Sequence, residues 1–258
     1  MQRPCGCGWS ERPVLQTWRP CFKSIGCNKV SLSPWHWRVN HSTPFLFSSM
    51  KLILASTSPR RRELLALLGL PFGVIPPSCE EIPSLNMAPS DQARTFAHDK
   101  AESIALQHPE ELVLGSDTVI EIEGTLLGKP QDLKEAESML RQLRGHCHQV
   151  HTGLALIQKA TNTSVARVET AHVWIKDFDE EELSEYLSTE ESLGKAGAYS
   201  IQGEGAKLIE KIEGDYPTIV GLPLWRVAKL LEEQGVGLPN SIDEIYRLKP
   251  YANWRDFT

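Results

Sequence analysis

A short apolar strand that runs directly into an arginine-rich helix start is the feature that most constrains the fold of this chain. Residues 52–55 read Leu-Ile-Leu-Ala, which predicts a buried strand. Ser58 is placed to cap the following helix and Pro59 to be its first residue. The leucines of 64–68 continue this helix up to Gly69. The segment therefore predicts a strand, a turn and an amphipathic helix in immediate succession.

The first turn of this predicted helix carries Arg60, Arg61 and Arg62. A helix N-terminus behaves like roughly half a positive charge, so each guanidinium there costs a few tenths to about 1 kcal/mol unless an anion binds. An exposed basic turn can also be only a solvated face. The hydroxyls of Ser56 and Ser58, and the fit of guanidinium to phosphate oxygens, favour a phosphate site. The sequence contains no P-loop motif.

Composition and charge limit the class of protein. With 258 residues, 41% of them hydrophobic, the chain can bury one large core or two modest ones. It contains no apolar run long enough to cross a membrane, which predicts a soluble globular protein. The first 49 residues hold six Lys or Arg and one Glu, so the rest is more acidic than the overall net charge of -6. An acidic body argues against nucleic-acid binding.

Residues 1–49 differ from the rest of the chain. They hold four of the six cysteines, whose spacing matches no common zinc motif, together with four tryptophans and little periodicity. They are either a targeting segment or an untranslated stretch before a true start at Met50, and the lack of an amphipathic pattern favours the second. Only Cys79 and Cys147 remain in the body, which suits a reducing compartment. We expect a cytoplasmic protein, with organelle targeting by residues 1–49 left open.

Strands and helices alternate along residues 50–236. The patterns predict strands over 52–55, 72–75, 112–115, 150–158, 164–178 and 207–212, with a hairpin over 119–127. They predict helices after Ser58, over 90–105, from a capping box at Asp132 and Glu135 to Leu143, from a cap at Asp179 and Glu182 to Leu187, and over 222–234. This alternation predicts an α/β domain with a mixed twisted sheet flanked by helices. The tail, 237–258, has no assignable role.

A few charged residues stand where chemistry is expected. Asp117 follows the predicted strand 112–115, where a carboxylate is equally a cap or a functional group at the sheet edge. Charged residues of both signs accompany Asp117 in the sequence, namely Lys129, Lys195 and Glu81. Two of them also have simpler interpretations, since Glu81 can be a solvated loop acid and Lys195 can be an exposed surface residue. Acids set among cations, without a histidine pair, suit magnesium-assisted attack of water on a phosphate chain.

His146, His148 and His151 form a second candidate constellation, because their spacing is similar to that of a zinc-binding strand. His146 and His148 share one face of the predicted strand, but no nearby acid joins them. We interpret the three histidines as the entry to a strand.

Several short motifs together resemble one family. They are, in chain order, Ser56-Thr57-Ser58-Pro59-Arg60-Arg61, Ser116-Asp117-Thr118, Gly128-Lys129-Pro130, Lys195-Ala196-Gly197-Ala198-Tyr199, Ile201-Gln202-Gly203 and Gly221-Leu222-Pro223. This set is similar to the Maf family of nucleoside triphosphate pyrophosphatases over about 51–235. The resemblance implies a fold related to the inosine triphosphatases, a divalent metal, and hydrolysis between the α- and β-phosphates of a nucleotide.

Arg60, Thr118 and Gln202 stand at the positions linked with substrate choice in that family, and they are similar to the branch acting on dTTP and UTP. The amide of Gln202 can both donate and accept, which matches the edge of thymine or uracil. Ser116 and Ser200 replace residues that are more often alanine and glycine in that branch. The branch acting on 7-methyl-GTP differs at the three positions and is the alternative.

The resemblance also implies a role for each site residue. Asp117 is expected to accept the proton of the attacking water and, with Glu81, to hold Mg²⁺ or Mn²⁺. The expected phosphate-binding and orienting residues are Ser56, Ser58, Arg60, Arg61, Lys100, Lys129 and Lys195. The expected partner is a nucleoside triphosphate, without nucleic acid or membrane, and homodimer formation is left open. A nucleotide-binding regulator of septum formation without turnover, and an arginine-based nucleic-acid module, are the rival functions.

Overall fold

The structure, a computed structural model, describes residues 51–84 and 86–257. The expectations for residues 1–49 lie outside this range. Among the described residues, one seven-stranded sheet has the order β2-β1-β3-β5-β6-β7, with β4 paired to β3. Its strands are β1 (Leu52–Ala55), β2 (Phe72–Ile75), β3 (Leu112–Ile122), β4 (Thr125–Leu127), β5 (Cys147–Gln158), β6 (Thr163–Ile175) and β7 (Ile209–Glu213). Strand β1 is parallel to β2 and β3, and the other pairs are antiparallel, which confirms the predicted mixed α/β sheet.

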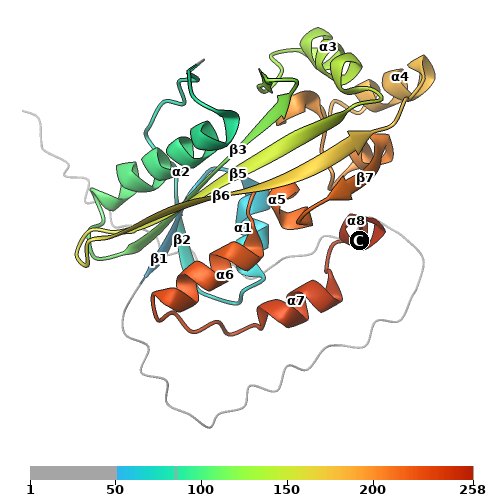
Figure 1. Cartoon of the computed structure of the whole chain (residues 1–258). Helices are drawn as coiled ribbons and strands as arrows, with labels where there is room; N and C mark the ends of the chain where they lie inside the picture. The colour runs from blue at the N-terminus through green and yellow to red at the C-terminus, as the bar shows by residue number, and fades with distance from the viewer. Residues whose placement is uncertain (1–50, 85, 258) are drawn as a thin grey trace, which may run out of the picture. The chain divides into compact units, whose positions relative to one another are not determined.

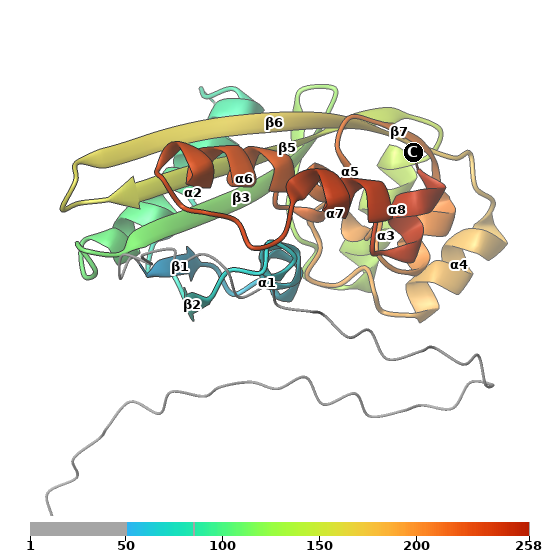
Figure 2. The same cartoon turned by 90° about the horizontal axis from the view of Figure 1, so that it is seen from below.

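Helices lie on both faces of this sheet (Figure 1). They are α1 (Pro59–Ala66), α2 (Pro89–Ala105), α3 (Leu133–Leu143), α4 (Glu180–Ser188), α5 (Tyr216–Val220), α6 (Leu224–Glu233), α7 (Ile242–Leu248) and α8 (Ala252–Asp256). Two 3₁₀ turns, Ala196–Ala198 and Glu204–Leu208, interrupt the glycine-rich stretch before β7. Figures 1 and 2 show α2 alone along one face, whereas α6 and α7 lie across the other. Every helix in the described part is too short or too polar to span a bilayer.

The two faces of each central strand enter different cores. In β1, Leu52 and Leu54 pack in the larger core with leucines of α1 and α6. Ile53 and Ala55 point the other way and pack with the alanines of α2. Because successive side chains of a strand alternate between faces, a strand that is covered on both sides reads as an unbroken apolar run.

Two glycines let α2 lie directly on the sheet. A Cβ on Gly115 would stand 2.2 Å from the carbonyl oxygen of Ala97, and one on Gly153 would stand 2.0 Å from that of Ala93. Any larger residue at these positions would push the helix away. The close contact has a functional consequence, because it brings Lys100 of α2 down to the strand that carries Asp117.

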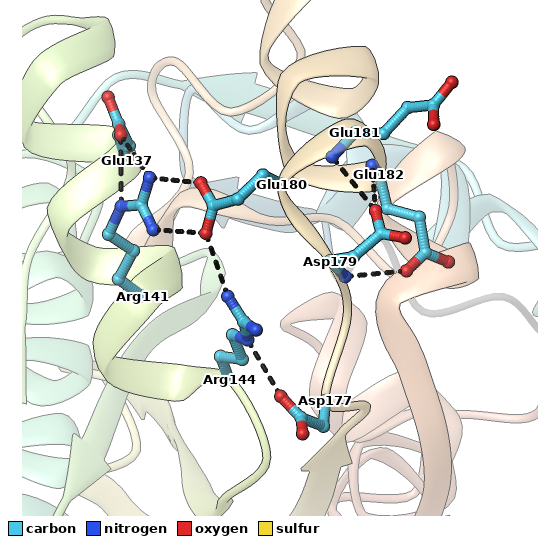
Figure 3. Close-up of polar contacts among 8 residues, drawn as sticks. All are labelled: Glu137, Arg141, Arg144, Asp177, Asp179, Glu180, Glu181 and Glu182. Carbon is cyan, nitrogen blue, oxygen red and sulfur yellow. Dashed lines mark hydrogen bonds and ion pairs between the residues drawn. The ribbon is translucent and has the colours of Figure 1, made fainter.

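The predicted helix caps agree with the structure in most respects. Ser58 accepts from the backbone N–H of Arg61, and Pro59 opens α1. Asp179 and Glu182 form a complete capping box at the start of α4 (Figure 3). At α3 the prediction is half right: Asp132 caps Glu135, but the Glu135 carboxylate accepts from the N–H of residue 131 instead of that of Asp132.

An exposed ion-pair network joins α3 to the start of α4 (Figure 3). Arg141 contacts both Glu137 and Glu180, and Arg144 contacts Glu180 and Asp177. Surface pairs of this kind contribute about 0–1 kcal/mol each. The network therefore aligns the two helices more than it stabilises the fold.

One strand prediction near the site is wrong. The strand predicted over 112–115 continues to Ile122, because antiparallel β5 pairs with it from Val113 to Glu121. Asp117 consequently lies inside β3 and not after it. Lys100 of α2 is only 6% exposed, because the close packing of this helix against the sheet encloses it.

Helices α5, α7 and α8 have no counterpart in the sequence-based prediction. Each is short, five to seven residues, and too brief to show a clear helical period. Ile242, Ile245 and Trp254 of the C-terminal segment nevertheless belong to the larger core. The tail is thus packed onto the body.

Candidate active site

A cavity of about 590 Å³ opens where β1 ends. The last residue of β1, Ala55, pairs with Gly115, and β4 pairs with β3 only from Ile120 onward, so residues 116–119 of β3 have no strand neighbour on that side. The loop from β1 into α1, the loop before α2, and the segments around Lys195 and Val220 enclose the space. Of the predicted site residues, Ser56, Ser58, Arg60, Arg61, Glu81, Lys100, Asp117, Thr118, Lys129 and Lys195 all line this cavity. Gln202 is half-buried and is not among the lining residues, although its neighbour Ile201 is.

Successive side chains of β3 point to opposite faces of the sheet, so its polar residues meet different partners. Asp117 is turned toward α2, where it meets Lys100. Ser116 and Thr118 are turned to the opposite face, where they meet Gly221 and Arg61. One strand segment therefore supplies an acidic group to one side of the site and hydroxyl groups to the other.

Lys100 joins the two acidic residues of the site. Its Nζ lies 2.5 Å from Oδ1 of Asp117 and 2.6 Å from Oε1 of Glu81. The side chains of Lys100 and Asp117 are 8% and 7% exposed, whereas that of Glu81 is 43% exposed. The buried pair is fixed by helix and strand, and Glu81 closes over it from a loop.

The two carboxylates are suited to a divalent metal. Carboxylate oxygens are the ligands that Mg²⁺ and Mn²⁺ prefer, and those of Glu81 and Asp117 already converge on one positive charge. In the described part of the chain, no three His, Cys, Asp or Glu side chains gather into a complete metal centre. The pair therefore fits a dication that is shared with substrate phosphates, as is common for Mg²⁺.

Arg61 is held by neutral acceptors. Its Nε donates to the carbonyl oxygen of Gly221 at 2.8 Å, and its Nη2 donates to Oγ1 of Thr118 at 3.0 Å. Gly221 ends α5 with a φ of 115°, a conformation that favours glycine. Burial lowers the pKa of Arg61, and the charge of Asp117 opposes this shift. The guanidinium is thus oriented without being neutralised by a salt bridge.

A directed chain of hydroxyls extends from Arg61. Thr152 donates to the carbonyl oxygen of Thr218 at 2.8 Å, so its own oxygen is free to accept from Thr118, 3.0 Å away. Thr118 then presents its lone pairs to Arg61. Sequence reasoning missed Thr152 and Thr218. The feature that identifies Thr152 is the strand register, which sets it opposite Thr118. This register cannot be read from the sequence before the strands are paired.

The remaining cations form the outer wall of the cavity. Burial lowers the pKa of Arg60, and burial together with the charge of Arg60 lowers the pKa of Lys195. No carboxylate in the described part of the chain forms an ion pair with Arg60, Lys129 or Lys195. The cavity lining thus holds five cationic side chains against two carboxylates.

The start of α1 adds further positive character to this wall. Its first turn contains no acidic residue, and Ser58 satisfies only one of its free N–H groups. Ser56 accepts a hydrogen bond from the backbone N–H of Ser58, and both residues line the cavity. The helix end and the arginines together have the charge that suits a polyanion.

Apolar residues also line the cavity, and together they are called the apolar wall: Ile120, Tyr199, Ile201, Ile219 and Val220. The hydroxyl of Tyr199 lies 2.8 Å from Nε2 of His148, and burial lowers the pKa of His148 to about 4. An apolar surface beside a cationic one suits a ligand with a phosphate chain and a planar ring.

The three histidines considered as zinc ligands have separate surroundings. His148 contacts Tyr199, His151 contacts Thr170, and His146 contacts the carbonyl oxygen of Arg144. His146 precedes β5 and the other two lie within it, in line with their interpretation as the entry to a strand.

Comparison with known proteins places the chain. A family model described as Maf-like protein matches residues 51–234. The dTTP/UTP pyrophosphatase of Thermoanaerobacter sp. strain X514 is 45% identical over 186 residues, covering 72% of this chain and 97% of that protein. Those of Syntrophus aciditrophicus (45%, covering 72% and 90%) and Carboxydothermus hydrogenoformans (43%, covering 72% and 100%) are similarly close. Because the family model matches most of the chain and these relatives are 43–45% identical over at least 90% of their own length, the chain belongs to the Maf family.

Proposed function

We propose that this protein hydrolyses dTTP and UTP between the α- and β-phosphates, releasing the nucleoside monophosphate and pyrophosphate. The observation that carries the proposal is the cavity in which four further cationic side chains and a helix N-terminus accompany the Lys100–Asp117 pair. The names of the relatives, dTTP/UTP pyrophosphatases, support the choice of nucleotide.

Binding of the phosphate chain falls to the cations without carboxylate partners. Arg60, Lys129 and Lys195 can meet phosphate oxygens directly, since no ion pair in the described part of the chain competes for them. The guanidinium of Arg61 is already held in one orientation by its hydrogen bonds to Gly221 and Thr118. A guanidinium held in place before the ligand arrives loses little entropy on binding.

Asp117 takes the proton of the water that attacks the α-phosphate. Its position inside β3 and its contact with Lys100 hold the carboxylate rigidly at the cavity floor. Negative charge grows on the departing pyrophosphate, and Arg60, Arg61 and Lys129 stabilise it. Ser56 and Ser58 orient the same oxygens from the turn before α1.

Glu81 and Asp117 would hold the divalent metal together with the substrate. A bound Mg²⁺ or Mn²⁺ supplies neutralisation of phosphate oxygens and polarisation of water. Lys100 then keeps the position of both carboxylates defined when the cavity is empty. The loop that carries Glu81 is exposed, so this ligand can adjust as the nucleotide enters.

The base lies against the apolar wall, near Ile201 and Tyr199. Gln202, with Arg60 and Thr118, selects the pyrimidine, since its amide can donate and accept at the same edge. Ile201 lines the cavity, so Gln202 is the immediate chain neighbour of a residue that would face the base.

A panel of nucleotides tests the proposal. The purified full-length protein is incubated with dTTP, UTP, CTP, GTP and 7-methyl-GTP, each with and without Mg²⁺, and pyrophosphate and orthophosphate are measured separately. We expect metal-dependent release of pyrophosphate, fastest with dTTP and UTP. Release of orthophosphate in its place, or fastest turnover of 7-methyl-GTP, would refute the assignment.

A further inference from the structure

The C-terminal segment, residues 236–257, lies beyond the family match at 51–234 but is anchored to the body. Trp254 is 1% exposed and stacks on Tyr216 with ring centroids 5.5 Å apart. Tyr246 packs edge-on against the same indole at 5.0 Å. Aromatic contacts of this kind bury much apolar area, so α7 and α8 sit on the domain as a fixed element.

The first link from this segment to the cavity is made by Asn253 of α8. Its Nδ2 donates to the carbonyl oxygen of Ile201 at 2.9 Å and to that of Gly203 at 3.4 Å. The two carbonyls flank Gln202, and Ile201 lines the cavity. One side-chain amide therefore hydrogen-bonds to the residue before and to the residue after Gln202.

The second link is made by Tyr246 of α7. Its hydroxyl donates to Oδ1 of Asp215 at 2.9 Å, and Asp215 also accepts from Oγ1 of Thr218. Asp215 precedes α5, whose Ile219 and Val220 form part of the apolar wall. The helix that ends at the carbonyl holding Arg61 is thus fixed at its other end by the C-terminal segment.

We infer that the C-terminal segment is a positioning element of the active site, in which Asn253 holds the 201–203 turn and Tyr246 holds α5 for the nucleoside. The inference rests on the proposed function. Its physical basis is that residues 201–203 form an irregular turn without ladder hydrogen bonds, and such turns stay in one conformation only when other groups hold them. Asn253 is next to the buried Trp254, so the backbone that carries the donor amide is held in place.

Asn253→Ala tests the inference, with Asn240→Ala as the matched control. Asn240 belongs to the same segment and also donates its amide to a backbone carbonyl, that of Leu67, which is not part of the cavity lining. Loss of a neutral hydrogen bond predicts a KM for dTTP and UTP about three- to tenfold higher in Asn253→Ala, with kcat within about twofold. Tyr246→Phe should raise KM in the same way, and Asn240→Ala should change neither constant.

Amide hydrogen exchange gives a readout that does not depend on turnover. Exchange over residues 200–205 should quicken in Asn253→Ala and stay at the wild-type rate in Asn240→Ala. If Asn253→Ala folds poorly, Asn253→Asp keeps the side-chain size and removes the donor. Wild-type KM and wild-type exchange in the Asn253 variant would overturn the inference. A wild-type protein that releases no pyrophosphate would refute the proposed function, while the exchange data would still decide the positioning role.

Discussion

Arg61 and Thr118 are joined by a hydrogen bond of 3.0 Å from the guanidinium to the hydroxyl, across 57 positions of the sequence. The hydroxyl of Thr118 donates a hydrogen bond to that of Thr152, which in turn donates to the carbonyl oxygen of Thr218. Every partner in this chain is neutral except the arginine at its end. The arrangement aims a full positive charge into the cavity, where an anionic ligand can complete it.

Removing the Thr118 hydroxyl should therefore weaken substrate binding. Thr118→Val leaves one guanidinium N–H without its acceptor and Thr152 without its donor, a cost of about 1–3 kcal/mol. We expect KM for dTTP to rise about tenfold, and Thr118→Ser to retain most of the affinity. Steady-state kinetics of the two variants checks this, and equal KM values in both would show that the hydroxyl has no such role.

Asp117→Asn should keep the fold and lose turnover. Lys100 retains its contact with Glu81, so no buried charge is left without a partner. Loss of the proton acceptor should lower kcat by a factor of about 10² to 10⁴. The measurement is kcat on dTTP together with the melting temperature, and Glu180→Gln in the exposed α3–α4 network is the control. A near-normal kcat in Asp117→Asn would remove Asp117 from the mechanism.

Lys100→Met should be more harmful to stability than the double variant Lys100→Met with Asp117→Asn. The single variant leaves the buried Asp117 carboxylate without its cation, which costs about 3–5 kcal/mol. The double variant removes both charges and should recover much of this loss. Urea unfolding of the three variants and the wild type gives the coupling free energy, and additive losses would contradict the pairing.

Arg60→Gln should stabilise the free protein and weaken its response to pyrophosphate. The substitution removes a positive charge from a helix N-terminus, a gain of a few tenths to about 1 kcal/mol. Arg62→Gln alters the same turn, but Arg62 is exposed and does not line the cavity. Thermal unfolding with and without inorganic pyrophosphate should show a smaller stabilisation by ligand in Arg60→Gln only. An unchanged shift there would exclude Arg60 from phosphate binding.

His148 should make the stability fall in mild acid. Burial lowers its pKa to about 4 in the folded protein, against 6.5 for an ordinary histidine. The unfolded chain then binds the extra proton first, so the contribution is complete above about pH 6.5 and is lost as the pH falls toward 4. We expect a loss of about 2 kcal/mol between about pH 7.5 and pH 5.

His148→Gln isolates this contribution. The variant keeps a polar partner for Tyr199 but does not titrate in this range, so its free energy of unfolding should vary less between the two pH values. Urea titrations of both proteins give the difference. Parallel pH dependence in the two would place the proton uptake on other groups.

Local signals in the sequence sufficed for much of the framework. The apolar run 52–55, the Ser58 cap and the complete box of Asp179 and Glu182 depend on residues a few positions apart, and all are confirmed. The arginine-rich turn predicts an anion site for the same reason, because helix polarity is a local property. Ten of the site residues expected from the family resemblance line one cavity.

Only the tertiary structure decided how these groups meet. That Asp117 lies inside β3 depends on pairing with β5, and the burial of Lys100 depends on two glycines in different strands. The Thr118–Thr152 contact and the grip of Asn253 on residues 201–203 link segments 34 to 52 positions apart. Sequence patterns report the period of one element, whereas strand order and register are set by the packing of the whole chain, and these determine which polar groups become neighbours.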